Sequence, residues 1–212
     1  AIQYFSLAAN QNHADAQFYL GVLYANGEHI NKDISKAIYY LKKASDQNDA
    51  TAQYNLGIIY FNSKKLEDLN NSIYYLTLAA NQNHSDAQAQ LGIIYYRKKL
   101  GRQDINKSMH YLLLAADQNN LTAHKILGYI YYEGLYFSRD INKAIYYFNI
   151  ASAQNDKDSQ CILGYIYQKG KYIERDINKA IHYYRLSATQ NNVISQYRLG
   201  SIYYKGKHIK RD

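Results

Sequence analysis

The amino-acid sequence predicts an all-α fold, an α/α superhelical solenoid of tandem antiparallel helix pairs with a period of about 36 residues. Three observations lead to this prediction. A Leu-Gly pair with tyrosine three residues after the glycine recurs at intervals of 36, 35, 36, 36 and 36 residues, its leucines being Leu20, Leu56, Leu91, Leu127, Leu163 and Leu199. Apolar residues recur at helical spacing, and the 212 residues contain no proline. A fixed period of this length is typical of stacked repeats, in which each unit buries its apolar face against its neighbours.

The period predicts a single repeat array over 1–212. Its parts are a half unit at 1–12, five units near 13–48, 49–83, 84–119, 120–155 and 156–191, and a partial unit at 192–212. Because the chain starts and stops inside a unit, we expect it to be a piece of a longer array. The incomplete units expose unpaired helix faces, so we expect either a monomer or end-to-end self-association.

Each unit is predicted to open with a leading helix. The first follows a helix within 1–12 and spans 14–26, and the others lie near 50–62, 85–97, 121–133, 157–169 and 193–205. The repeated tyrosine is expected to be core in every unit, at Tyr24, Tyr60, Tyr95, Tyr131, Tyr167 and Tyr203. A polar residue earlier in each leading helix is expected to hydrogen-bond across the stack, at Gln17, Gln53, Gln88, His124, Gln160 and Gln196.

Each unit is predicted to close with a trailing helix, near 34–46, 69–81, 105–117, 141–153 and 177–189. An aspartate before each of these helices predicts the N-cap, at Asp33, Asp68, Asp104, Asp140 and Asp176. Each ends in Gln-Asn, and asparagine readily adopts the left-handed conformation that ends a helix, here at Asn12, Asn48, Asn83, Asn119, Asn155 and Asn191. Glycine predicts the same ending for four leading helices, at Gly27, Gly134, Gly170 and Gly206.

Glycine in the middle of a helix costs roughly 1 kcal/mol relative to alanine. The repeated glycine occupies that position six times, at Gly21, Gly57, Gly92, Gly128, Gly164 and Gly200. We predict that close contact with a pair of small residues in the trailing helix offsets this cost. Those pairs are Ala44-Ser45, Ala79-Ala80, Ala115-Ala116, Ala151-Ser152 and Ser187-Ala188.

One unit shows the whole motif at Ala123, Leu127, Gly128, Tyr131, Gly134, Asp140, Lys143, Ala144, Tyr146, Tyr147, Ala151 and Asn155. On these residues the entire chain resembles the Sel1-like repeat family, a relative of the tetratricopeptide repeat, although asparagine replaces the family's closing glycine throughout. The resemblance implies right-handed superhelices that act as adaptors in protein complexes. It therefore implies a non-enzymatic scaffold that binds a protein or peptide, as an extended segment or a helix, on its concave face.

One bacterial branch of that family carries a cysteine pair in each repeat and has been linked to penicillin binding. This chain has one cysteine, Cys161, so the hydrolase or penicillin-binding activity of that branch is the least favoured reading. A single cysteine also excludes an internal disulfide framework, which favours a reducing compartment such as the cytoplasm.

Leading helices line the concave side in proteins that this chain resembles. At 100° per residue, positions 18, 22 and 25 lie opposite the core-facing side of the first leading helix. Equivalent positions change from unit to unit yet stay rich in aromatic residues, namely Phe18, Tyr54, Phe61, Tyr96, Tyr129, Tyr132, Tyr165, Tyr197 and Tyr204. Tyrosine adds contact area and a hydrogen bond at little entropic cost, so these residues are candidate partner-binding residues. The alternative is that they only pack between adjacent leading helices.

Positive charge gathers between paired helices, at Lys64, Lys65, Arg97, Lys98, Lys99, Arg102, Lys169, Lys171 and Arg175. These residues predict a basic edge, which either serves solubility or recognises a polyanion such as an acidic protein, an anionic lipid or nucleic acid. No nucleic-acid-binding motif accompanies the edge, so DNA is not an expected partner.

The sequence contains no pattern that indicates catalysis. Its seven histidines lack the spacing of a metal site, and no phosphate-binding loop or nucleophile elbow is present. No apolar run is long enough to span a membrane. We therefore expect no enzyme activity, cofactor, metal or membrane span.

Overall fold

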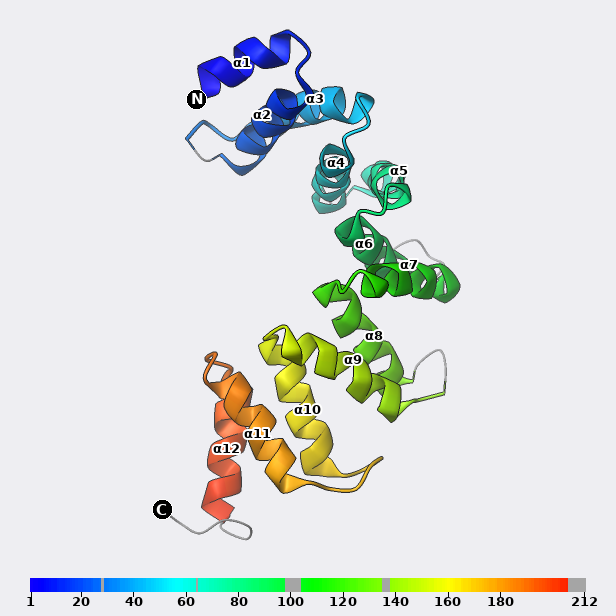
Figure 1. The fold of residues 1–212 in the computed structure, drawn as a ribbon, viewed down its shortest axis with the longest axis vertical. Coiled ribbons are helices and arrows are strands. Elements are labelled where there is room, and N and C mark those ends of the chain that lie inside the picture. The colour runs from blue at the N-terminus through cyan, green and yellow to red at the C-terminus, as the bar shows by residue number, and fades with distance from the viewer. Residues whose placement is uncertain (28, 64, 98–103, 135–137, 206–212) are drawn as a thin grey trace. The chain divides into compact units, whose positions relative to one another are not determined.

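The computed structural model describes the chain apart from residues 28, 64, 98–103, 135–137 and 206–212, and apart from the side chains of Leu66 and Lys205. Across the described residues the secondary structure is twelve α-helices without a strand (Figure 1). Their bounds are α1 Ile2–Asn10, α2 Ala14–Asn26, α3 Ile34–Asp46, α4 Ala50–Asn62, α5 Leu66–Asn81, α6 Ser85–Tyr96, α7 Ile105–Asp117, α8 Leu121–Glu133, α9 Ile141–Ala153, α10 Lys157–Lys169, α11 Ile177–Ala188 and α12 Val193–Lys205. The all-helical fold with paired helices repeating at about 36 residues is thereby confirmed.

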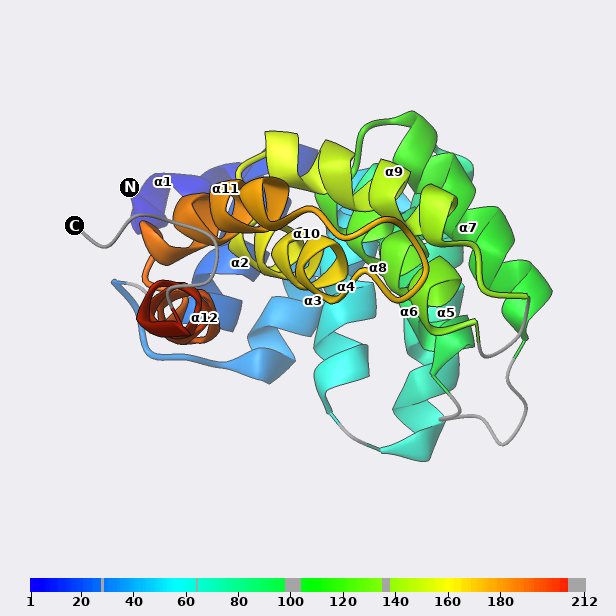
Figure 2. The same ribbon diagram turned by 90° about the horizontal axis from the view of Figure 1, so that it is seen from below.

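The chain forms two compact units, Ala1–Gln118 with α1 to α7 and Asn119–Asp212 with α8 to α12. In the first unit, α2, α4 and α6 pair with α3, α5 and α7. In the second unit, α8 pairs with α9, and α10 pairs with α11. Helices α10 and α11 run side by side in both views (Figure 1 and Figure 2).

Contacts within one pair show that its helices are antiparallel. Gly21 of α2 meets Leu41 of α3, whereas Tyr24, further along α2, lies beneath the ammonium of Lys36, which is earlier in α3. The backbone N–H of Asp33 donates to the carbonyl of Tyr24 at 3.0 Å and ties the start of α3 to the last turn of α2. The short loop therefore fixes the register of the hairpin.

Five of the mid-helix glycines permit close approach, whereas an added Cβ on Gly200 would have nothing within 4 Å, and the predicted contact with the small pairs is wrong. A Cβ built on Gly21, Gly57 or Gly92 would lie 2.5 Å from Cγ of a leucine in the paired helix. On Gly128 and Gly164 it would lie 2.7 Å from the rings of Phe148 and Tyr184. The small pairs lie about a turn further along the trailing helix, where Ala44 packs with Ala52 and Leu56 of the next leading helix. The small residues thus pack between repeats, whereas the glycines allow the two helices of one repeat to approach closely.

Four predicted N-caps are confirmed, because Asp33, Asp104, Asp140 and Asp176 each accept a hydrogen bond from the N–H three residues later. Asp68 is not an N-cap. Helix α5 begins earlier, at Leu66, and its cap position is Lys65, which makes no side-chain cap bond. Asp68 lies in the first turn beside Glu67, where its charge still favours the positive end of the helix dipole.

The left-handed helix endings are confirmed for all six asparagines, whose φ angles lie between 59° and 67°. Gly27, Gly134 and Gly170 end their helices in the same conformation, and Gly206 lies outside the described residues. His29 also has a positive φ of 61°, which the sequence analysis did not predict.

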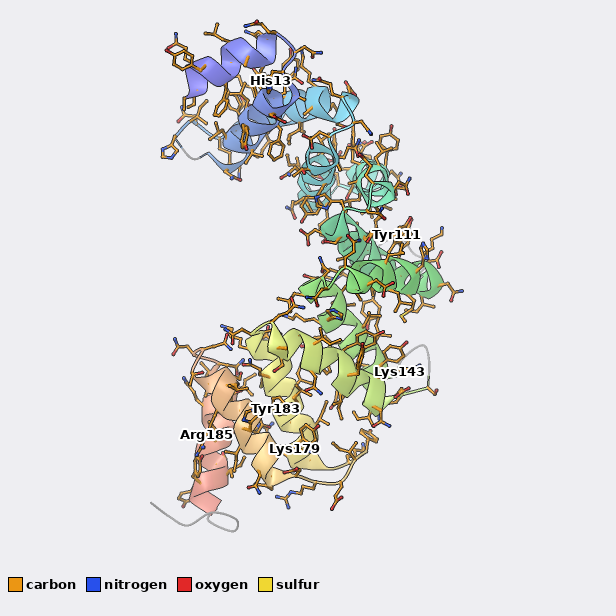
Figure 3. The ribbon with its side chains drawn as sticks, in the orientation of Figure 1. His13, Tyr111, Lys143, Lys179, Tyr183 and Arg185 are labelled. Carbon is orange, nitrogen blue, oxygen red and sulfur yellow. The ribbon has the colours of Figure 1, made fainter. Side chains whose placement is uncertain are left out.

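The repeated tyrosine is half-buried rather than fully buried, and in α12 Tyr203 is exposed. Its ring stacks almost parallel on an aromatic ring of the trailing helix, as in Tyr131 with Tyr147 at 5.8 Å and Tyr167 with Tyr183 at 5.8 Å. The ammonium of Lys143 covers the ring of Tyr131, and that of Lys179 covers the ring of Tyr167 in the same way. Figure 3 labels the two lysines, Lys143 on α9 and Lys179 on α11. Parallel aromatic stacks of this kind occur in the α2–α3, α4–α5, α6–α7, α8–α9 and α10–α11 pairs.

The expected hydrogen bonds of the repeated glutamines are present. Gln17, Gln53, Gln88 and Gln160 each accept from a glutamine at the end of the following trailing helix at 2.7–2.8 Å. Gln196 donates to the carbonyl of Ala188 at 3.3 Å. His124 is the exception, because both of its buried ring nitrogens lack a hydrogen-bond partner among the described residues. The equivalent trailing-helix glutamine, Gln154, donates instead to the backbone carbonyl and side chain of Asn119.

Candidate functional site: an aromatic groove with a basic rim

In the first unit, the predicted partner-binding aromatics are half-buried and pack against the core. Phe18 packs against the cluster of Leu41 and Leu56, while Tyr54 and Phe61 pack against the cluster that contains Leu76. Tyr54 also stacks on the ring of His84 at 4.7 Å. Packing between helices therefore accounts for these three side chains, and Tyr96 is half-buried as well.

In the second unit, the predicted aromatics line two adjoining cavities. The larger has a volume of about 380 Å³ and the smaller about 210 Å³, and Tyr132 of α8 and Tyr165 of α10 line both. Tyr129 lines the smaller cavity only. All three tyrosines are half-buried, with part of each side chain open to solvent. We call the two cavities together the Tyr132–Tyr165 groove.

The larger cavity has a basic rim. Arg139, Lys169 and Lys171 line it together with one carboxylate, Glu133. The Tyr165 ring has two cations above it, since Nζ of Lys169 lies 5.7 Å and Cζ of Arg198 lies 5.4 Å from its centroid. The structure thus joins two sets of residues that the sequence placed in separate candidate sites, the aromatic face and the basic edge.

The guanidinium of Arg139 is held in place by the end of α8 and by Tyr172 in the loop between α10 and α11. Its Nε donates to the carbonyl of Tyr132 at 2.7 Å, and its Nη2 donates to the carbonyl of Glu133 at 3.1 Å. Its Nη1 donates to the hydroxyl of Tyr172, and the guanidinium also lies 4.4 Å from the Tyr172 ring centroid. These contacts orient the positive charge at the edge of the cavity.

An ion-pair cluster connects the start of α10 to α8 beside Tyr129. The ammonium of Lys125 lies 2.8 Å from Asp156 and 3.3 Å from Asp158. Burial by itself raises the pKa of Asp156, but hydrogen bonds from Lys125 and Ser159 outweigh it and hold that pKa below its usual value. Burial and the nearby Asp158 together raise the pKa of Tyr129. Both carboxylates are therefore already paired.

Tyr184 forms the floor of the smaller cavity. Its side chain is fully buried, and its hydroxyl donates to Oε1 of Gln168 at 2.9 Å. Burial raises its pKa far above the usual value, so the phenol stays neutral. Cys161, Ile162 and Ile194 add apolar lining, and Arg198 is the charged residue of this cavity.

The other predicted site residues lie outside this groove. Tyr197 and Tyr204 on α12 are 71% and 85% exposed. Lys65, Arg97 and Arg175 are exposed. The remaining basic-edge positions, Lys64, Lys98, Lys99 and Arg102, lie outside the described residues.

Sequence reasoning missed Arg139, Tyr172, Tyr184 and Arg198. The sequence contains a signal for Arg139, because Arg139 precedes the capping Asp140 just as Arg175 precedes the capping Asp176. Of these two arginines, the predicted basic edge includes only Arg175. Tyr184 occupies the register of Leu41, so it looked like an ordinary core position.

In the part of the chain that the structure describes, no three His, Cys, Asp or Glu side chains are grouped so that they could hold a metal ion. None of the described helices has the length and apolar character needed to cross a membrane.

The sequence matches the Sel1 repeat family over residues 1–13, 14–49, 50–84, 85–120, 122–156, 157–192 and 193–212. The chain therefore belongs to the Sel1 repeat family, and its fold and repeated motifs agree with that assignment. A single functional array over 1–212 stays a prediction. No curated protein matches the sequence.

Solved structures of the same fold come from several bacteria. The chain is similar to a protective antigen of uropathogenic Escherichia coli that displays an SLR fold, with 28% identity, a TM-score of 0.88, and coverage of 99% of this chain and 45% of that one. It thus spans less than half of the antigen structure. It is also similar to a Sel1 repeat protein from Oxalobacter formigenes, with 28% identity, a TM-score of 0.82, and coverage of 100% and 94%. An immunity protein from Pseudomonas aeruginosa shares the fold at 21% identity and a TM-score of 0.57, over 92% of this chain and 75% of that chain.

Proposed function

We propose that this Sel1 repeat protein is a non-enzymatic scaffold that binds a peptide or a helix of a protein partner on the inner surface of its leading helices. In the second unit, that surface is the Tyr132–Tyr165 groove. The observation that supports the proposal most is the pair of adjoining cavities whose shared walls are half-buried tyrosines.

The groove has the physical character of a protein-binding site. Half-buried aromatic side chains already have restricted rotamers, so burying their remaining surface costs little conformational entropy. Their hydroxyls offer hydrogen bonds that fix the orientation of a partner. Binding residues in a repeat protein are also free to vary between repeats, and the aromatic residues on this face do vary.

The test is capture of partners from the native lysate by the parent chain and by the double variant Tyr129→Ala/Tyr165→Ala. The matched control is Tyr39→Ala/Tyr146→Ala, which removes two tyrosines that are 54% and 59% exposed on trailing helices. We expect the groove variant to lose the captured proteins and the control to retain them. Circular dichroism melts identify any variant that has lost its fold.

Retention of the same proteins by a folded groove variant would contradict the proposal. Loss of the captured proteins in both the groove variant and the control variant would mean that binding is not specific to the groove, and it would also contradict the proposal.

A second candidate function is binding of a polyanion by the basic edge. It is favoured by the exposed cations in each unit, Lys65 and Arg97 in the first and Lys169, Lys171 and Arg175 in the second. Heparin affinity measured at two salt concentrations tests it, because counterion release makes such binding fall steeply with salt. Binding that is absent at low salt would exclude this function.

A further inference from the structure

The two cavities of the Tyr132–Tyr165 groove differ in chemistry. The smaller one is lined mainly by apolar side chains and tyrosine rings, including Ile162, Ile194 and the buried Tyr184, together with one charged residue, Arg198. The larger one carries the basic rim of Arg139, Lys169 and Lys171. A ligand that fills both cavities must therefore present an apolar group beside negative charge.

The positive charge of the groove is not neutralised by the protein. Among the described residues, no carboxylate lies within 4.0 Å of the charged nitrogens of Arg139, Lys169, Lys171 or Arg198, whereas Lys125 is paired with two. The lining of the larger cavity contains three cations and one carboxylate, Glu133, and Arg198 adds a fourth cation in the smaller cavity. Four cations against one carboxylate leave a formal charge of +3 around the shared tyrosines.

The cations lie over aromatic rings, which keeps them in place without discharging them. Lys169 and Arg198 lie over Tyr165, and Lys171 lies 5.0 Å from the centroid of the Tyr172 ring. A cation over a ring face retains N–H groups that can donate to an incoming acceptor. The tyrosines thus supply both the apolar contact and the positions of the charges.

We propose that the occupant of the Tyr132–Tyr165 groove is an acidic protein segment in which carboxylates flank an aromatic or branched aliphatic residue. The apolar side chain enters the smaller cavity, and the carboxylates accept hydrogen bonds from Arg139, Lys169 and Lys171. This inference rests on the proposed function and specifies its partner. Complementary charge would determine specificity and association rate, and the tyrosines would provide most of the buried area.

The experiment is selection from a random peptide library displayed on phage, with the intact chain as target. Depletion against Tyr132→Ala/Tyr165→Ala retains only peptides that depend on the groove. We expect the retained pool to be enriched in aspartate and glutamate around one large apolar residue. The affinity of an enriched peptide is then measured by fluorescence anisotropy, together with a version in which asparagine and glutamine replace its acids.

The charge test uses two lysines of the same helix. Lys157 and Lys169 are the first and last residues of α10, both exposed, and about 18 Å apart along the helix axis. Lys169→Glu should weaken binding of the acidic peptide by about tenfold or more, because like charges then meet in the groove. Lys157→Glu should change the affinity by less than about twofold, since added salt screens charges at that distance.

The outcomes separate this inference from the proposed function. Groove-dependent peptides that are neutral or basic, or equal effects of the two lysine variants, would overturn the acidic ligand while leaving a protein-binding groove. Failure to obtain any groove-dependent peptide would overturn both. An enriched acidic pool whose binding is weakened by about tenfold or more in Lys169→Glu and in the amide peptide would support both.

Discussion

Gly128 lies directly against the ring of Phe148, where an added Cβ would be 2.7 Å from Cε1. This contact sets how closely α8 and α9 approach. The ring is fully buried, and it also meets Tyr129 edge-on at 5.3 Å between centroids. It therefore cannot move aside without disturbing the wall of the groove.

The glycine contact predicts that Gly128→Ala destabilises the protein by about 1 to 3 kcal/mol through overpacking, and that Gly128→Leu costs more. Urea unfolding followed by far-UV circular dichroism measures both values. Gly200→Ala on α12 is the control, because nothing lies within 4 Å of the added Cβ and alanine favours the helix by about 1 kcal/mol. Equal stability of Gly128→Ala and the parent would show that the close approach does not matter.

The early start of α5 makes a second prediction. Asp140→Ala removes an N-cap bond of 3.0 Å to the N–H of Lys143 and should cost about 1 to 2 kcal/mol. Asp68→Ala should cost about half of that or less, because Asp68 lies inside the first turn and contributes only through the helix dipole. Thermal unfolding of the two variants tests this prediction. A larger loss of stability in Asp68→Ala than in Asp140→Ala would mean that α5 starts after Asp68.

The unpartnered ring nitrogens of His124 predict a stabilising substitution. His124→Gln should raise the free energy of unfolding by about 1 to 3 kcal/mol, since a glutamine there can accept from Gln154 as Gln160 accepts from Gln190. Urea titration of the variant gives the value. A loss of stability would show that the imidazole packing outweighs the missing hydrogen bonds.

The same histidine predicts a pH dependence. Burial lowers the pKa of His124 below the value of about 6.5 expected in the unfolded chain, so the unfolded chain binds the proton more readily. The stability linked to this residue is fully present above about pH 6.5 and is lost as the pH falls below it. The difference in unfolding free energy between His124→Gln and the parent should therefore widen from pH 7 to about pH 5. An unfolding free-energy difference between His124→Gln and the parent that stays the same from pH 7 to about pH 5 would refute the assignment.

Most of the fold could be predicted from the repeat period of the sequence. Ten predicted helices agree with the structure to within one residue at each end, and so do the asparagine endings, because capping and turn chemistry are local. The start of α5 differs because the segment before Asp68 lacks a glycine stop and its acids favour a first turn. The register of Gly128 with Phe148 depends on how two helices pack, which helical spacing alone does not specify.

The groove was only partly predictable. Helical periodicity placed Tyr129, Tyr132 and Tyr165 on one face, and these three do line the cavities. Arg139 and Tyr172 come from two loops that meet only when consecutive repeats stack. Their contribution therefore requires the tertiary structure.

The most direct test of the account is amide hydrogen exchange of the chain with and without a bound partner segment. Binding in the Tyr132–Tyr165 groove predicts slower amide exchange in α8 and α10 around Tyr129, Tyr132 and Tyr165, with α9 around the exposed Tyr146 unaffected. Protection confined to the trailing helices, with α8 and α10 unchanged, would contradict the claim that the leading helices form the binding surface.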